Sequence, residues 1–397
     1  MTHKKLRILM VMHMPWSREL GAPRVSLETA DEFIKLGHTV EKFDIVDAFP
    51  APSKLETYFL QARFPSKAIN FVRENAHRFD VIQAEHGNLP RSKADLKFRG
   101  LLVARCNGLA HFYDAYGKQA NAKDKTLGIK RGTAVGNLLR YIATKSSGGL
   151  GDVEKSFNYA DLIVLNNKEE YDFVSQKLGH AGKVHSFPNG FSEIRFAQFE
   201  AERVTPAERW KQQLVVFIGG WGQRKGSDDF PAIVSSIRER LPDVRFLFLG
   251  TGIRSDALKS SFASKDRDSI SVISSYKSDE LPHLLRNATT AILPTYIEGF
   301  PSGVLESCVA GIPTVSYDVP GPREMLKLFD RKLLTPAGDT KAIADATVSL
   351  LSLGVESYCS LSEQTASVAS RFRWKDIADN MLDLYYEKLS ELKALSS

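Results

Sequence analysis

Residues 296–321, with the sequence YIEGFPSGVLESCVAGIPTVSYDVPG, decide the expected fold. They follow the apolar run 291–293, which is typical of a buried β-strand. The chain then turns through glycines and a proline, and a helical pattern begins near Ser302 and ends at Gly311, with Pro313 just beyond. This order places a helix N-terminus at the carboxyl end of a strand, where backbone N–H groups and the helix dipole favour anions.

Two glutamates of this stretch, Glu298 and Glu306, are candidates for ligand contact. Glu298 precedes the helix and Glu306 lies in its first turns, and helical side chains tilt toward the N-terminus, so both can face one pocket. A carboxylate accepts two hydrogen bonds and suits the vicinal hydroxyls of a sugar or ribose. Phosphate at the amides and a hydroxylated ring at each carboxylate together describe a nucleotide-sugar. The spacing by itself is also compatible with chance, since an acid in a first turn complements the helix dipole.

The composition is that of an ordinary globular protein. With 397 residues the chain exceeds what one hydrophobic core usually holds, so two domains are expected. The three cysteines are scattered without metal-ligand spacing, which indicates a reducing compartment. No stretch reaches the ~18 apolar residues of a membrane span, and the N-terminal run is expected to be a first strand rather than a signal peptide. We therefore expect a cytoplasmic protein.

Apolar runs alternate with helical patterns along most of the chain, which is typical of α/β proteins with parallel sheets covered on both faces. The polar stretch 195–213 separates two such halves. We predict an N-terminal acceptor-side Rossmann-like domain at 1–195, a linker at 196–213, a nucleotide-sugar-binding Rossmann-like domain at 214–373, and a C-terminal helix at 374–397 that packs back toward the N-terminal domain. The cleft between two such domains is the default site. The expected strands are Leu6–Met12, Thr39–Phe43, Val81–Ala84, Leu101–Arg105, Leu162–Leu165, Leu214–Ile218, Arg245–Leu249, Ser271–Ile273, Ala291–Leu293 and Pro313–Tyr317.

Residues 293–326, LPTYIEGFPSGVLESCVAGIPTVSYDVPGPREML, resemble the signature of the family 4 glycosyltransferases, retaining enzymes of the GT-B fold. The resemblance extends along most of the chain, more weakly toward the N-terminus. It implies a metal-independent enzyme that transfers a sugar, with retention, from a UDP- or GDP-linked donor to a glycan or lipid-linked acceptor in cell-envelope polysaccharide or glycolipid synthesis. The positions that match are Pro294, Glu298, Gly299, Phe300, Leu305, Glu306, Ala310, Gly311, Pro313, Gly321 and Glu324.

Residues 217–226, FIGGWGQRKG, resemble the phosphate loop of the family, in which a basic pair holds the donor diphosphate. Lys225 matches the lysine of that pair. The family's arginine position is Gly220 here, and Arg224 is the candidate substitute, since a cation there can neutralise the leaving group. The resemblance places Glu306 on the ribose, and Tyr276 either stacks on the base or lies on the surface. The predicted donor-binding residues are Gly21, Gly219, Arg224, Lys225, Tyr276, Gly299, Phe300, Ser302, Gly303, Val304 and Glu306.

In the first half, the resemblance implies a glycine loop that approaches the donor phosphate and the acceptor; Gly21 matches it, and Ala22 replaces its second glycine. Many relatives carry a histidine beside the transferred sugar at the position of Asn107, and His111 follows shortly after. A front-face mechanism needs no protein base, because the leaving phosphate can take the acceptor proton. The predicted catalytic residues are Glu298, Asn107 and His111. The predicted acceptor-side residues are Arg24, Glu85 and His86, although a lone histidine is more often structural.

The net charge of +6 is concentrated in residues 118–145, which hold seven Lys/Arg and the single acid Asp124. A basic stretch that ends in apolar residues is typical of attachment to an anionic membrane surface at the inner face, and a phosphorylated acceptor fits equally. A solvated helical face is the alternative. Nucleic acid is not an expected partner, because the segment lacks interleaved aromatic residues and the chain shows no reader motif.

Two other functions compete with the transferase. Gly220 and Asn107 motivate a non-catalytic nucleotide-sugar-binding protein. A sugar-nucleotide epimerase of the same fold would call for acidic and basic catalytic groups in the first half. No cofactor and no metal are expected, because helix dipoles and cations hold the phosphates in this fold. Residues 266–268 spell a DxD in a polar loop, which we interpret as coincidence.

Overall fold

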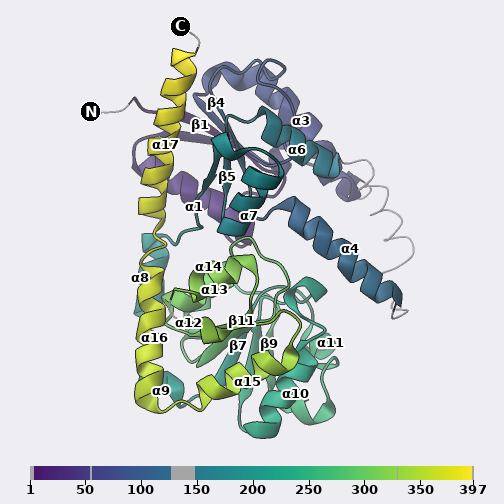
Figure 1. Cartoon of the computed structure of the whole chain (residues 1–397), viewed down its shortest axis with the longest axis vertical. Helices are drawn as coiled ribbons and strands as arrows, with labels where there is room; N and C mark the ends of the chain where they lie inside the picture. Colours follow the sequence, from purple (N-terminus) through teal and green to yellow (C-terminus); the bar gives the residue numbers. More distant parts are fainter. Residues whose placement is uncertain (1–3, 54–55, 127–147, 329, 396–397) are drawn as a thin grey trace. The chain divides into compact units, whose positions relative to one another are not determined.

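The computed structural model describes residues 4–53, 56–126, 148–328 and 330–395 (Figure 1). The chain divides into two compact units. Unit 1 comprises Met1–Pro188 together with Trp374–Ser397, and unit 2 comprises Asn189–Arg373. Because unit 2 is inserted between the two parts of unit 1, the backbone passes between the units twice.

In the described part of unit 1, six parallel strands form one sheet in the order β2-β1-β3-β4-β5-β6. Strand β5 and all but one end residue of β1 and of β4 are apolar, as expected when a parallel sheet is buried on both faces. The chain adds β2 on one side of β1 and then β3 on the other, so the order reverses between β1 and β3. The strands are β1 (Arg7–Val11), β2 (Thr39–Phe43), β3 (Val81–Glu85), β4 (Leu101–Arg105), β5 (Leu162–Leu165) and β6 (Val184–Ser186).

Helices cover both faces of this sheet. Alternate strand residues point to opposite faces, so Ile8 packs with α1 and α17, whereas Leu9 packs with α3. The helices are α1 (Gly21–Lys35), α2 (Ile45–Ala48), α3 (Leu60–Asn75), α4 (Ala110–Thr126), α6 (Gly149–Tyr159), α7 (Lys168–Asp172) and α17 (Trp374–Ala394). Short 3-10 helices lie at Glu56–Tyr58, Ala76–Arg78 and Ala181–Lys183, and a π-helical segment at Phe173–Lys177.

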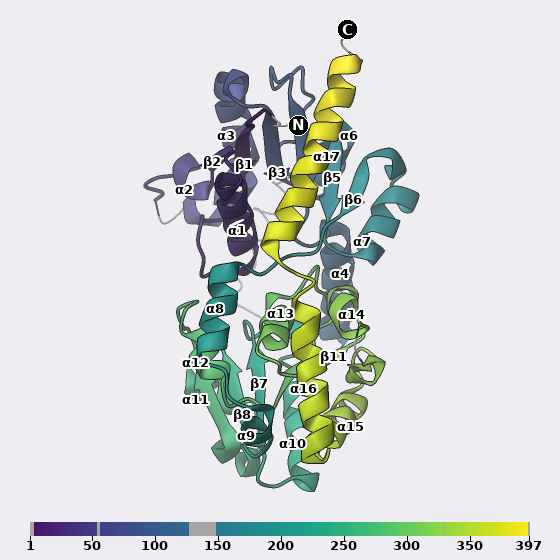
Figure 2. The same cartoon turned by 90° about the vertical axis from the view of Figure 1, so that its left-hand side faces the viewer.

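The last helix, α17, completes the core of unit 1 (Figure 2). Its apolar residues recur at helical spacing and form one stripe that faces α1 and the sheet. Trp374 is fully buried, and its indole Nε1 donates to Glu28 Oε2 of α1 at 2.7 Å. The hydroxyl of Tyr385 donates to Gln83 Oε1 on β3, also at 2.7 Å. The chain segment farthest along the sequence is therefore structurally part of the first unit.

Among the described residues of unit 2, six parallel strands form a second sheet in the order β12-β11-β10-β7-β8-β9. The order reverses between β7 and β10, and in open α/β sheets ligands bind at such a switch point, outside the carboxyl ends of the strands. The strands are β7 (Leu214–Ile218), β8 (Arg245–Leu249), β9 (Ile270–Ile273), β10 (Thr290–Leu293), β11 (Thr314–Tyr317) and β12 (Leu334–Thr335).

The helices of unit 2 enclose one continuous hydrophobic core around this sheet. They are α8 (Glu193–Ala201), α9 (Pro206–Trp210), α10 (Phe230–Arg240), α11 (Ser255–Lys259), α12 (Leu281–Leu285), α13 (Ser302–Val309), α14 (Pro320–Leu326), α15 (Thr340–Leu351) and α16 (Val355–Ala369). Short 3-10 turns lie at Gln223–Lys225, Ser264–Ser269 and Arg331–Leu333.

The division into units differs from the domain boundaries expected from the sequence. Residues 196–213, expected to be a linker, contain most of α8 and all of α9 and belong to unit 2. Two features make this polar stretch helical: Thr205 and Glu208 form a capping box at the start of α9, and Phe199 is buried in the core of unit 2. The boundary itself lies between Pro188 and Asn189.

Only the beginning of the basic segment 118–145 lies within the described residues. Positions 118–126 form the end of α4, a helix without a buried residue, and 127–145 lie outside the described residues. In the part of the chain that the structure describes, we find no helix whose length and apolar character would let it cross a membrane.

Candidate donor and acceptor sites

The switch point of unit 2 brings together the predicted acid Glu298 and the predicted cations Arg224 and Lys225. The cations lie in the turn that follows β7, and Glu298 follows β10. Arg224 Nη1 donates to Glu298 Oε1 at 2.6 Å, and Lys225 Nζ pairs with the same oxygen. The hydroxyl of Thr295, which is fully buried, lies 3.1 Å both from Oε1 and from the carbonyl oxygen of Arg224, so its one proton is shared between these acceptors. Residues 74 positions apart thus form one charged cluster.

Glu298 is 8% exposed, and this burial opposes its ionisation. Burial alone would raise the pKa of Glu298, but the charges of Lys225 and Arg224 outweigh it and hold this pKa below its ordinary value. The side chain is therefore a carboxylate at neutral pH.

Two glycines allow the loops of this cluster to approach each other closely. Gly226 adopts φ +79°, and a Cβ there would lie 2.3 Å from the carbonyl oxygen of Pro294. At Gly321, a Cβ would lie 2.9 Å from the carbonyl oxygen of Glu298. A larger residue at Gly226 would push the turn that carries Arg224 and Lys225 away from Pro294, and one at Gly321 would push the start of α14 away from the loop that carries Glu298.

A second polar cluster, not expected from the sequence, ties the segment that follows residues 217–226 to the sheet. Tyr296 and Tyr317 both donate from their hydroxyls to Asp229 Oδ2, at 2.6 and 2.8 Å. Asp229 directly precedes α10, so these bonds join the segment after the phosphate loop to the ends of β10 and β11. An aspartate three residues beyond Lys225-Gly226 was the available sequence signal, but nothing in the sequence pairs it with two tyrosines.

Glu306 lies on α13 in a buried ion pair. Arg195 Nη2 of α8 donates to Glu306 Oε1 at 2.6 Å, and the two residues are 7% and 2% exposed. The guanidinium carbon of Arg195 also lies 4.1 Å from the ring centre of Phe191. The structure thus holds Glu306 by Arg195 rather than by the cations that contact Glu298.

The other predicted donor-binding residues of unit 2 surround the same strand ends. Gly219 follows β7, Gly299 lies in the turn before α13, and Ser302, Gly303 and Val304 form its first turn. Phe300 is 5% exposed and packs edge-on against Phe372, with ring centres 5.4 Å apart, so its ring belongs to the core. Tyr276 lies beyond β9 beside Gly250, where a Cβ would meet its ring at 3.1 Å.

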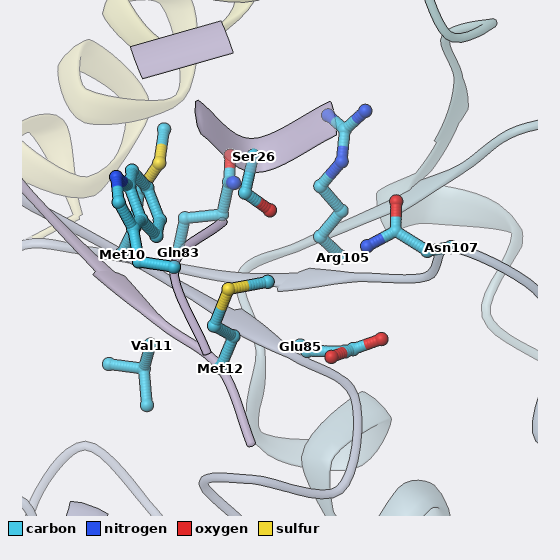
Figure 3. A pocket seen from close by; sticks show the side chains of 9 residues that line it. Met10, Val11, Met12, Ser26, Gln83, Glu85, Arg105 and Asn107 are labelled. Atoms are coloured by element: carbon cyan, nitrogen blue, oxygen red, sulfur yellow. The ribbon is translucent and has the colours of Figure 1, made fainter. Parts of the chain in front are cut away.

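In unit 1, a small pocket lies at the carboxyl ends of β1, β3 and β4 (Figure 3). Gln83 and Glu85 from β3 line it together with Arg105, Asn107 and Ser26. Its volume of about 10 Å³, as space for the centre of a water molecule, admits roughly one water. The predicted residues Glu85 and Asn107 therefore line the same small cavity.

His13, which the sequence did not single out, pairs with Glu85. It lies just after β1, and its Nδ1 is 3.2 Å from Glu85 Oε2. Burial alone would lower the pKa of His13, but Glu85 outweighs it and raises this pKa above its ordinary value. Burial likewise opposes the charge on Glu85, yet its close contact and charge interaction with His13 lower the pKa of Glu85. The short distance and the opposite directions of the two pKa shifts both favour an imidazolium–carboxylate pair.

We expect the His13–Glu85 pair to make the stability of unit 1 depend on pH. The raised pKa of His13 adds stability that is fully present below pH 6.5 and is lost as pH rises through the pKa of the folded state. The lowered pKa of Glu85 adds stability that is fully present above pH 4.5 and is lost as pH falls through the pKa of the folded state. The free-energy difference between the native protein and His13→Gln should therefore be greatest between these two values, at about 1 kcal/mol or less, because His13 is partly exposed. Hydrogen exchange in unit 1 at both pH extremes measures it; a difference that persists unchanged at high pH would contradict the pair.

The remaining predicted residues of unit 1 have structural partners. His86 stacks on Phe157 with ring centres 6.1 Å apart, and burial lowers its pKa, so it is neutral. His111 Nε2 lies 3.4 Å from Glu154 Oε1 on α6. Arg24 is 9% exposed, and its Nε donates to the carbonyl of Arg18 at 2.6 Å. Gly21 opens α1, and a Cβ there would meet open space.

Glu170, another residue not expected from the sequence, supports the loop that carries Asn107. It lies on α7 and is 1% exposed, and its Oε1 accepts from the backbone N–H of Leu109 at 2.9 Å. Burial raises the pKa of Glu170 to about 7. The loop between β4 and α4 is thus held by a carboxyl group that changes charge near neutral pH.

In the described residues, no group of three or more His, Cys, Asp or Glu side chains is arranged to hold a metal ion. Asp266 of the DxD sequence is buried, with Oδ1 3.6 Å from Arg238 Nε. Asp266 therefore has a structural role in unit 2 as the partner of Arg238.

Comparison with known families identifies the class of the second unit. Residues 198–368 match the family model described as Glycosyl transferases group 1. This region contains the sheet of unit 2, residues 217–226 and α13, so the match to group 1 glycosyltransferases lies within unit 2.

Two curated relatives are glycosyltransferases by name. The 2-deoxystreptamine N-acetyl-D-glucosaminyltransferase of Niallia circulans is 23% identical over 45% of this chain and 46% of its own length. The D-inositol 3-phosphate glycosyltransferase of Mycobacteroides abscessus is 26% identical over 62% of this chain and 56% of its own length. The chain thus spans about half the length of these relatives.

Solved structures share the fold over nearly the whole chain. Sucrose-phosphate synthase from Thermosynechococcus elongatus aligns with a TM-score of 0.69 at 15% identity, covering 98% of this chain and 100% of that one. Anabaena HepE in complex with UDP and glucose aligns with a TM-score of 0.64 at 13% identity, covering 96% and 100%. These neighbours and the two parallel sheets confirm the predicted fold class, GT-B with two Rossmann-like domains.

Proposed function

We propose that this protein is a retaining glycosyltransferase of family 4 type that transfers a sugar from a nucleotide-sugar to an acceptor hydroxyl. The observation that carries the proposal is the cluster of Glu298, Arg224 and Lys225 at the switch point of a group 1 glycosyltransferase domain. Cations, a helix N-terminus and a buried carboxylate at one strand edge match the phosphates and hydroxyls of a nucleotide-sugar.

Each part of the donor has a proposed partner. Arg224 and Lys225 neutralise the diphosphate as it leaves, together with the backbone amides at the start of α13. Glu298 accepts hydrogen bonds from hydroxyls of the transferred sugar. Glu306 accepts hydrogen bonds from the ribose hydroxyls, and Arg195 fixes its carboxylate in place. Tyr276 stacks on the base. The structural neighbour HepE binds UDP and glucose, which supports a donor of this class.

Unit 1 supplies the acceptor side in this proposal. Glu85 at the end of β3 and Asn107 just after β4 are the proposed partners of the sugar hydroxyls, and the small pocket that they line would have to widen to admit the acceptor. The leaving phosphate takes the acceptor proton, so Asn107 in place of a histidine is compatible with transfer. We propose a glycan or lipid-linked acceptor, and an anionic membrane surface as the partner of the segment 118–145.

A non-catalytic nucleotide-sugar-binding protein is the second candidate. Gly220 stands where the phosphate loop of the family carries an arginine, and the two cations that remain are already engaged with Glu298. Binding without turnover would follow if this arrangement holds the donor but stabilises the leaving diphosphate too weakly.

Thermal unfolding with UDP, GDP, ADP and their sugars tests the donor. A ligand at about 100 times its Kd stabilises the protein by about 2.7 kcal/mol. We expect a shift with one nucleotide-sugar that is lost in Lys225→Met, because this change removes a diphosphate cation, and in Glu306→Ala. Lys265→Met is the matched control, since Lys265 is an exposed lysine of unit 2 that pairs with Glu239.

Turnover separates the two candidates. NMR of the product formed from the donor that binds should show the same anomeric configuration as the donor sugar. Binding of donor without transfer to any offered acceptor would favour the binding protein. No thermal shift with any nucleotide or nucleotide-sugar would contradict both.

A further inference from the structure

The anion site of unit 2 is already occupied by a side chain of the same unit. Arg224 and Lys225 both contact Oε1 of Glu298, and Thr295 donates to the same oxygen. Charge-assisted hydrogen bonds of this kind are among the strongest that proteins form. A phosphate that approaches Arg224 and Lys225 therefore finds them already paired with the carboxylate of Glu298.

The surroundings make this occupancy strong. The side chains of Glu298 and Lys225 are only 9% and 17% exposed, and charges interact more strongly when water is excluded. The carboxylate is ionised at neutral pH, because the two cations outweigh the effect of its burial on its pKa. One negative charge faces two positive ones, so the site keeps a net attraction for an anion with more charge than a carboxylate.

We propose that Glu298 is an internal competitor for the diphosphate site and thereby discriminates a nucleotide-sugar from a nucleoside diphosphate. The inference rests on the proposed function. A diphosphate displaces the Glu298 carboxylate from Arg224 and Lys225. When a sugar is attached, the displaced carboxylate finds new donors in the sugar hydroxyls; when the sugar is gone, it does not. The carboxylate then competes to regain the cations, which favours release of the spent nucleoside diphosphate.

The test measures the affinity of Glu298→Gln for inorganic pyrophosphate, and for UDP, GDP and ADP, by titration calorimetry on the full chain. Glutamine has nearly the same shape but no charge. We expect it to bind pyrophosphate, and the nucleoside diphosphate of the donor, about ten-fold more tightly than the native protein does, as the loss of one charge-assisted contact predicts. Its affinity for the nucleotide-sugar should rise less or fall, because the sugar loses a carboxylate partner.

Two further variants complete the design. Glu193→Gln is the matched control, since Glu193 is an exposed glutamate of unit 2 paired with Arg373, and it should leave pyrophosphate affinity unchanged. Thr295→Val removes one hydrogen bond to Oε1 without changing any charge. It should tighten pyrophosphate binding in the same direction by less than about ten-fold, because it removes one hydrogen bond to the carboxylate and leaves both cations in place. It also provides a second test if Glu298→Gln folds poorly.

Unchanged or weaker pyrophosphate binding in Glu298→Gln overturns the proposal, because Glu298 would then orient the cations rather than compete with the anion. Absence of pyrophosphate binding in both proteins overturns it as well. The proposed function can fail separately. If Glu298→Gln binds pyrophosphate more tightly but the native protein binds no nucleotide-sugar, Glu298 still competes for the anion site, and the proposed transferase function is rejected.

Discussion

Replacing Arg195 with methionine is expected to lower the free energy of unfolding of unit 2 by about 3–5 kcal/mol, the usual cost of removing one partner from a buried ion pair. Arg195 and Glu306 are 7% and 2% exposed, so the carboxylate that remains cannot regain the hydration it lost on folding. The guanidinium also leaves the face of Phe191, which adds to the loss. Hydrogen exchange followed by mass spectrometry measures the effect in peptides of unit 2.

Two variants show whether the stranded charge is the cause. The double variant Arg195→Met with Glu306→Leu should recover most of the lost stability, since an apolar pair of similar volume often replaces a buried ion pair without cost. Arg373→Met breaks the exposed pair with Glu193 and should cost less than about 1 kcal/mol. Equal decreases in the free energy of unfolding in Arg195→Met and Arg373→Met would show that burial does not increase the cost of breaking the Arg195–Glu306 pair.

Compared with the native protein, Glu170→Gln is expected to stabilise unit 1 more at alkaline pH than at acidic pH. The pKa of Glu170 rises from 4.5 to about 7 on folding, so the folded protein binds this proton more tightly than the unfolded chain does. The native protein therefore loses stability as pH rises from 4.5 to about 7, by about 3 kcal/mol at 1.36 kcal/mol for each pH unit. Glutamine keeps an oxygen for the N–H of Leu109 but does not ionise.

The measurement is the unfolding free energy of unit 1, by hydrogen exchange, in both proteins at about pH 4 and about pH 8. The advantage of Glu170→Gln over the native protein should be about 3 kcal/mol larger at the higher pH. Glu154→Gln, at a largely exposed site of the same unit, is the control and should show little pH dependence. An advantage that does not change with pH would mean that Glu170 ionises in the folded protein as it does in the unfolded chain.

Most of the sheet structure could be predicted from sequence because parallel strands leave a strong local signal. The apolar runs at Leu101–Arg105, Leu214–Ile218 and Arg245–Leu249 are strands with those same bounds. The short strands β6 and β12 were missed, since three and two residues carry no recognisable pattern. The stretch expected to be a linker was misjudged because its charges hide the few apolar residues that anchor α8 and α9.

The site was predictable to the extent that its residues follow strands. Glu298, Arg224 and Lys225 were expected to serve one ligand, and the structure brings them into contact. Their contact with one another was not expected, because each was considered only as a partner of the ligand. Arg195, Asp229 and Glu170 were missed for a different reason: each acts through a tertiary neighbour far along the chain, and one sequence contains no record of such pairs.

The return of α17 to unit 1 reverses the usual order of folding during synthesis. Domains generally form in the order in which they leave the ribosome, at about 5–20 residues per second. Here the apolar face of β1, β3 and β4 must wait for α17 while the 185 residues of Asn189–Arg373 are made, which takes about ten to forty seconds at that rate. Unit 2, which is continuous in sequence, is complete before unit 1. The nascent first unit therefore exposes this apolar face until α17 has been made, after the chain of unit 2 is complete.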